Sequence, residues 1–155
     1  MELRDQIGDA LKQAMRDKAV DRLSTLRLIN AAIKDRDIAK RAEGGDAGDA
    51  GVGAAEILQI LGKMVKQRQE SARAYEEGGR VELAEKERQE VTVIEEFLPK
   101  QLDADETAAA VEAAIAATGA NSIRDMGKVM GALKSKFTGQ MDFSTVGPMV
   151  KDKLG

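Results

Sequence analysis

The C-terminal part of the chain has the residues with the clearest binding chemistry. Between positions 126 and 155 it has five lysines and two acidic residues, so this stretch carries a net charge of +3. Lysine ammonium groups bind phosphate as point charges, and a glycine lets the backbone approach a phosphate closely. We therefore expect these residues to contact the phosphates of an RNA. The candidate RNA-binding residues are Lys128, Lys134, Lys136, Gly139, Lys151 and Lys153.

A second basic group lies nearer the N-terminus. Arg22, Arg27 and Lys34 fall in a segment with helical periodicity, where they form a secondary basic face. The same segment contains several aspartates, so a solvated face of mixed charge is the simpler explanation of these residues, with contact to an RNA backbone as the alternative. Both interpretations stay open at this point.

The composition argues against most kinds of catalytic site. The chain has no Cys and no His, which removes the thiolate nucleophile, the commonest general base and the commonest metal ligands. The acid pairs Glu76-Glu77 and Glu95-Glu96 occupy neighbouring helical positions, which point about 100° apart and do not converge. The glycine-rich stretch 44–53 lacks the Lys-Ser/Thr pair that a phosphate-binding loop requires. We therefore predict no catalytic residue, no metal ligand and no cofactor.

Charge and hydropathy restrict the partners. The chain has a net charge of −3 at pH 7, so it is not a generic nucleic-acid binder with a large positive charge. Positive charge is confined to the two ends, since residues 1–42 also carry a net charge of +3. No run of 18 apolar residues exists, and the N-terminus lacks the apolar segment of a signal peptide. We expect a cytoplasmic protein with no membrane partner.

The periodicity of apolar residues predicts an all-α fold. In the first 98 residues, apolar positions recur every three or four residues in four segments. We expect an N-terminal domain of long helical hairpins over 1–98, interrupted by a flexible acidic loop at 43–53. The predicted helices cover residues 2–18, 22–42, 54–77 and 81–98, with Asp21 as the cap of the second.

Pro99 predicts a boundary, because proline disfavours helical geometry in the residue before it. We expect a hinge at 99–102 and a three-helix domain over 103–155, in which the first helix covers 104–118. Pro148 removes a helical hydrogen bond, so we expect the last helix to begin near Thr145 with Pro148 in its first turn. Gly127 and Gly131 lie one turn apart in the middle helix, which suggests that the alanine-rich first helix packs closely against them.

Four stretches resemble a known family, and they occur in that family's order. They are RLSTLRLINAAIK (Arg22–Lys34), QRQESARAYEEGGRVELAEKERQEV (Gln67–Val91), EEFLPKQL (Glu95–Leu102) and DMGKVMGALKSKFTGQMDFSTV (Asp125–Val146). On these motifs the chain resembles the GatB/YqeY family, and within it the stand-alone YqeY-like proteins. The LPKQL stretch and the MGKVMG and GQMD stretches are the most specific. The resemblance implies an N-terminal domain of long helices and a small C-terminal three-helix domain.

The resemblance also implies a function in tRNA-dependent amidation. The C-terminal domain is similar to the tail of GatB, a subunit of the glutamine-dependent amidotransferase that amidates misacylated Glu-tRNA or Asp-tRNA. That tail helps to hold tRNA, and the residues here that match its turn region are Lys134, Lys136 and Gly139. The family is associated with carbon–nitrogen ligase activity with glutamine as amido-N-donor. This chain lacks the catalytic portion of GatB, so the expectation is an accessory tRNA-binding protein without a catalytic centre of its own.

Two other functions remain open. In the first, the chain is a protein–protein adaptor that docks on the amidotransferase or on another translation component. Exposed apolar residues such as Leu28 or Val93 would then matter more than the lysines. In the second, the chain is itself an enzyme and amidates Glu-tRNA without another protein.

Overall fold

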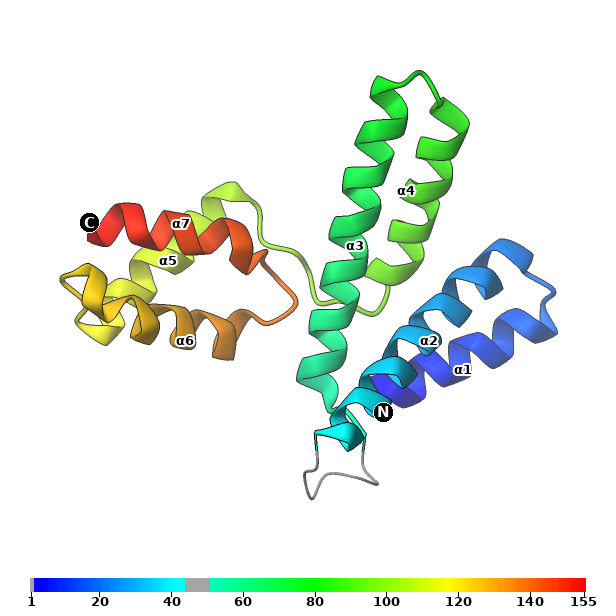
Figure 1. The fold of residues 1–155 in the computed structure, drawn as a ribbon, viewed down its shortest axis with the longest axis horizontal. Helices are drawn as coiled ribbons and strands as arrows, with labels where there is room; N and C mark the ends of the chain where they lie inside the picture. The colour runs from blue at the N-terminus through cyan, green and yellow to red at the C-terminus, as the bar shows by residue number, and fades with distance from the viewer. Residues whose placement is uncertain (1, 44–50) are drawn as a thin grey trace. The chain divides into compact units, whose positions relative to one another are not determined.

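The computed structural model describes residues 2–43 and 51–155, and within these ranges all of its regular secondary structure is helical (Figure 1). It contains seven α-helices, one short 3₁₀ turn and no strand in the described residues, which confirms the all-α prediction. The chain divides into two compact units, one ending at Leu98 and the other covering Pro99–Gly155. Each unit buries its own apolar core. Most of the predicted loop 43–53 lies outside the described residues.

The first unit consists of two helical hairpins (Figure 1). Helices α1 (Leu3–Arg16) and α2 (Val20–Ala42) form one hairpin, and α3 (Ala54–Glu77) and α4 (Val81–Glu95) form the other. Apolar residues three or four positions apart share one helix face, so each helix presents one stripe to the core. The buried residues of this core include Ile7, Leu26, Ile29, Ile33, Ile57, Leu61 and Ile94.

Tight turns set the ends of these helices. Helix α3 ends at Gly78-Gly79, where Arg80 N–H donates to the carbonyl of Tyr75 at 2.7 Å and Gly79 has a φ of 75°. This pair of features is a Schellman turn. A similar turn ends α1. There Ala19 N–H donates to the carbonyl of Ala14 at 3.1 Å, and Lys18 has a φ of 54°.

The α1–α2 turn corrects the predicted start of α2. We expected α2 to begin at about Arg22 with Asp21 as its cap, but it begins at Val20. The turn brings the chain directly into helical geometry, because Leu23 N–H already donates to the carbonyl of Ala19 at 2.8 Å. Asp21 therefore lies in the first helical turn, where its negative charge favours the positive end of the helix dipole.

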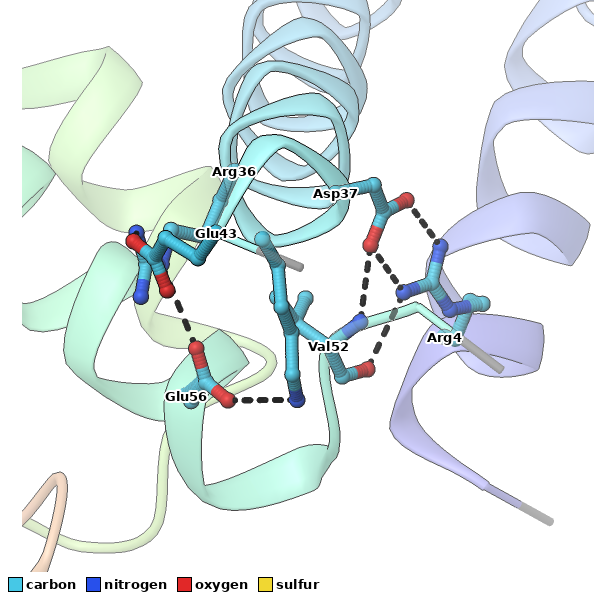
Figure 2. Close-up of polar contacts among 7 residues, drawn as sticks. Arg4, Arg36, Asp37, Glu43, Val52 and Glu56 are labelled. Carbon is cyan, nitrogen blue, oxygen red and sulfur yellow. Dashed lines mark hydrogen bonds and ion pairs between the residues drawn. The ribbon is translucent and has the colours of Figure 1, made fainter. Parts of the chain in front are cut away.

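Polar contacts join the start of α3 to α1 and α2 (Figure 2). Asp37 accepts hydrogen bonds from both terminal nitrogens of Arg4 at 3.0 Å and from the backbone N–H of Val52 at 2.8 Å. Arg4 also donates to the carbonyl of Val52 at 3.0 Å, and the Val52 side chain is buried. Gly51, with a φ of 69°, lies against this group: a Cβ there would be 2.7 Å from Asp37 Oδ1. We call these four residues the Asp37 cluster.

Glu56 provides a second polar link at the same end of α3. Its carboxylate accepts from Lys40 Nζ at 3.0 Å and from Arg36 Nε at 3.3 Å, and Arg36 also pairs with Glu43. Figure 2 shows Arg36, Glu43 and Glu56 grouped beside the end of α2. These pairs join α2 to α3 on either side of residues 44–50.

The second unit is a three-helix bundle, with α5 (Ala104–Thr118), α6 (Met126–Phe137) and α7 (Phe143–Leu154) (Figure 1). A 3₁₀ turn, η1 (Ile123–Asp125), precedes α6. Helix α5 starts with a capping box, in which Asp103 accepts from Glu106 N–H at 2.7 Å and Glu106 accepts from Asp103 N–H at 3.2 Å. The core residues are Val111, Val129, Leu133, Met141, Val146 and Val150.

The predicted start of the last helix is wrong. Helix α7 begins at Phe143, so Pro148 lies inside it rather than in its first turn. Asp142 sets the start, because its carboxylate accepts from both the N–H and the hydroxyl of Ser144, at 3.0 and 2.6 Å. Proline clashes with the Cβ of the residue before it, and that residue here is Gly147. The absence of a Cβ at Gly147 removes that clash.

Candidate nucleic-acid interface

The turn between α6 and α7 is bound to the segment that opens the second unit. Leu102 N–H donates to the carbonyl of Gln140 at 2.9 Å, and the Gln140 side-chain amide donates to the carbonyl of Lys100 at 3.1 Å. The Gln101 amide donates to the carbonyl of Gly139. We call these crossed contacts the glutamine clamp. It joins LPKQL to GQMD. These are two of the three stretches that are most specific for the family that the sequence resembles.

Gly139 makes the turn possible. Its φ is 83°, a left-handed conformation that glycine adopts without steric cost. Its carbonyl accepts from Gln101, so the observed role of Gly139 is to shape the turn and support the glutamine clamp.

A groove with a volume of about 350 Å³ opens beside the glutamine clamp. Its lining is mainly apolar and includes Leu102, Met141, Val146 and Met149. No lysine or arginine lines it, so this groove does not supply the cations that a phosphate ligand needs.

Three of the five candidate lysines already interact within the second unit. Lys153 Nζ is 2.9 Å from Glu112 on α5, and Lys128 Nζ is 3.9 Å from Asp125. The ammonium group of Lys136 lies 5.4 Å from the centre of the Phe137 ring. Lys134 and Lys151 are exposed and make no ion pair with any residue of this fully described unit. These two therefore have the most readily available charges.

The helical geometry separates neighbouring lysines. Successive residues point about 100° apart, so Lys134 and Lys136 leave α6 about 200° apart. The same spacing separates Lys151 from Lys153 on α7. Lys151 instead lines a shallow depression with Met126 and residues of α7. The five lysines thus do not form a single patch.

One face of α6 does combine two lysines with open backbone. Gly127, Lys128, Gly131 and Lys134 are all exposed, and their spacing places them on one side of the helix. Lys128 precedes Gly131 by three positions and Lys134 follows it by three, so the two lysines flank the glycine. A Cβ added at Gly127 or Gly131 would meet no atom within 4 Å. We call this surface the glycine–lysine face of α6.

This finding corrects the expected role of the two glycines. We predicted that the alanine-rich helix α5 packs closely against Gly127 and Gly131. Both glycines instead point to open space, because the buried side of α6 is formed by Val129 and Leu133. Their missing side chains leave bare helix backbone on the surface.

The secondary basic face is also partly neutralised. Arg22 forms an ion pair with Glu96, at the end of the α3–α4 hairpin. Arg27 and Lys34 are exposed on α2 and make no ion pair with any residue in 2–43 or 51–98. Leu28, beside them, is 43% exposed. Val93 packs against the core of the first unit, so only Leu28 of the two predicted adaptor residues is fully available.

The ionisable groups show ion pairing rather than acid–base chemistry. The pKa of Asp37 is lowered chiefly by its hydrogen bonds with Arg4, and that of Glu56 chiefly by its hydrogen bond with Lys40. A lowered pKa keeps a carboxylate ionised and makes it a weaker proton acceptor at neutral pH. Across the described ranges, no three Asp or Glu residues lie close enough together to hold a metal ion. None of the described helices is long and apolar enough to cross a membrane.

Sequence reasoning missed the glutamine clamp and the Asp37 cluster. Gln101 and Gln140 are far apart in the chain, and so are Arg4 and Asp37. The one local signal was the LPKQL and GQMD motifs, each of which contains one of the glutamines.

Comparison with known proteins agrees with this architecture. The family model for YqeY-like proteins matches residues 4–154, which is nearly the whole chain. A relative from Clavispora lusitaniae, altered inheritance of mitochondria protein 41, mitochondrial, is 36% identical over 88 residues. That match covers 57% of this chain and 46% of the relative, so it spans about half the length of each protein.

Proposed function

The chain belongs to the family of YqeY-like proteins, and on this premise we propose that it is an accessory RNA-binding protein whose ligand is tRNA. In this proposal it serves a tRNA-dependent amidotransferase and has no catalytic centre of its own. The resemblance to the tail of GatB that we infer from the sequence of residues 103–155 is the reason for choosing tRNA and this enzyme. We further propose that it acts in the cytoplasm.

The glycine–lysine face of α6 is the observation that carries the proposal. A glycine inside a helix costs about 1 kcal/mol relative to alanine. No packing within the second unit compensates for this cost at Gly127 or Gly131, since a Cβ added at either position would meet no atom of the unit outside the helix backbone within 4 Å. Contact with a ligand outside the chain supplies a reason for both glycines.

The chemistry of this face suits a phosphate backbone. A surface without side chains lets a sugar–phosphate chain come close to the helix, while Lys128 and Lys134 on either side supply positive charge. The remainder of the unit limits the affinity, because residues 99–155 have seven basic and seven acidic residues. We therefore expect modest binding that depends strongly on salt.

Binding of fluorescent tRNA, followed by anisotropy at two salt concentrations, tests this function. Changing Lys128 and Lys134 together to Glu is expected to abolish most of the binding. Each lysine that contacts a phosphate adds about 0.7–0.9 to the slope of log K against log salt. Changing either lysine to Ala should therefore reduce the slope by about one.

A matched control changes Lys63 and Lys86 to Glu. Both are exposed lysines of the first unit, so this variant has the same net charge as the test variant. Equal loss of binding in the two variants would show a nonspecific charge effect and would refute the assigned face. No binding of tRNA by the unchanged protein at low salt would refute the function. A complex with the amidotransferase that survives nuclease would favour the adaptor instead.

The link to amidation needs its own assay. Purified protein is added to a glutamine-dependent amidotransferase with limiting Glu-tRNA, and amidation is measured with and without it. We expect a change in the KM for tRNA, with no amidation by the chain alone. Amidation by the chain alone would show that it is an enzyme.

A further inference from the structure

Helix α2 has one packed apolar face, and on the opposite side it has a second face where exposed apolar residues alternate with charged ones. Leu26, Ile29 and Ile33 lie in the core of the first unit. On the opposite side Val20 is 74% exposed and Ile38 is 62% exposed. Surface helices usually have charged or polar residues on that side. No other helix of the first unit, in its described residues, covers this second face.

The second face is continuous along the helix. Its residues recur at spacings of three and four, which places them in one stripe. They are Val20, Ser24, Arg27, Leu28, Ala31, Lys34, Asp35 and Ile38, and all of them are exposed. The helix has 23 residues, so the stripe is about 34 Å long at 1.5 Å per residue. We call it the outer stripe of α2.

We propose that the occupant of the outer stripe is the same stripe of a second copy of this chain, antiparallel to the first. A two-fold axis through Ala31 generates this pairing. Ala31 is the middle residue of Val20–Ala42, and its small side chain allows the two helices to approach closely. Helices in such pairs lie about 8–10 Å apart.

Two of the three charged residues in the stripe, Arg27 and Asp35, pair with each other across the axis in this arrangement, while Lys34 faces Leu28. Residues at equal distances on either side of Ala31 face each other across the axis. Arg27 lies one turn before Ala31 and Asp35 lies one turn after it, so each Arg27 faces an Asp35 of the other copy. The symmetry makes two such pairs. Within one helix these two residues are separated by about 12 Å, which is too far for an ion pair.

The first unit offers no other partner for these two charges among its described residues. Arg27 and Asp35 are both exposed, and neither forms an ion pair within 2–43 or 51–98. The carboxylate of Asp35 at the middle of the stripe also disfavours an anionic occupant such as RNA or a lipid headgroup. An uncharged or acidic helix would leave Asp35 unpaired, whereas a second copy pairs both charges.

The pairing is tested by sedimentation of the full chain from about 1 µM to about 1 mM. A reversible dimer is expected. Arg27→Asp brings two aspartates together at each pair, and Asp35→Arg brings two arginines together. Each single change should weaken dimerisation at least tenfold. The double change, Arg27→Asp with Asp35→Arg, restores opposite charges and should recover most of the affinity.

Lys86→Asp, an exposed lysine of α4, serves as the control and should leave dimerisation unchanged. All the changed residues are exposed, so circular dichroism should show the same helix content in every variant. A chain that is monomeric over the whole range would overturn the proposal. It would also fail if the double change is no better than the single changes, because the dimer would then use another surface.

Discussion

Replacing Gly131 by Ala tests the structural basis of the glycine–lysine face. Gly131 lies in the middle of α6 with helical backbone geometry, and an added Cβ meets no atom within 4 Å. The only expected contribution to the free energy of unfolding is the difference in helix propensity, which is about 0.8–1.0 kcal/mol in favour of alanine. The second unit should therefore become more stable by about 1 kcal/mol. Gly127 lies in the first turn of α6, so Gly127→Ala should add less.

The assay is thermal and urea unfolding of the full chain, followed by circular dichroism. For a unit of this size, 1 kcal/mol corresponds to an increase in Tm of about 4–8 °C. The same variant should bind tRNA more weakly, because the methyl group keeps the phosphate backbone away from the helix. A residue used only for folding would not show opposite effects on stability and binding.

Gly119→Ala is the matched control. A Cβ at Gly119 also meets no atom within 4 Å, but its φ is 67° at the C-terminus of α5. A left-handed conformation costs a residue with a side chain about 1–2 kcal/mol. Gly119→Ala should therefore destabilise the unit. If Gly131→Ala also destabilises it, then the face of α6 is packed in solution and our reasoning about open backbone is refuted.

Three further changes test other contacts. Asp37→Asn should destabilise the first unit by roughly 1–2 kcal/mol at pH 7, because charge-assisted hydrogen bonds to the partly exposed Arg4 are lost. The pKa of Asp37 is lowered from 3.8, so its contribution is present above that pH and disappears as the pH falls through the lowered value. Urea unfolding at pH 7 and pH 3 should accordingly show a smaller difference between the two proteins in acid. Gly51→Ala should cost about 2 kcal/mol or more, measured in the same way, since the Cβ would lie 2.7 Å from Asp37 in a left-handed backbone. Gln140→Ala should cost about 1 kcal/mol and speed amide hydrogen exchange at Leu102, because the clamp loses its hydrogen bond to Lys100.

Some features could be predicted because they depend on neighbouring residues. Apolar residues three or four positions apart predict a helix wherever they occur, so the all-α fold followed from the sequence. Gly78-Gly79 and the Asp103–Glu106 capping box act over a few residues, and the predicted helix end at 77 and helix start at 104 beside them agree with the structure. Pro148 misled the prediction, because its interior position depends on Gly147 and on the cap at Asp142 together.

Other features were decided only by the tertiary structure. The sequence predicts that five lysines all contact RNA, but an ion pair with Glu112 on α5 engages Lys153, and helical geometry separates Lys134 from Lys136. Whether a charge is available depends on which acidic groups the fold brings within about 4 Å of it. The sequence does not contain those distances.

The sequence by itself thus determined the helices, their apolar stripes and most of their ends, since these come from local spacing. It could not decide which side of a helix stays uncovered. Gly127 and Gly131 were expected to be packed against the alanine-rich helix. The structure leaves both the glycine–lysine face of α6 and the outer stripe of α2 open. The physical reason is that exposure depends on how helices distant in sequence pack together, which local propensity does not encode.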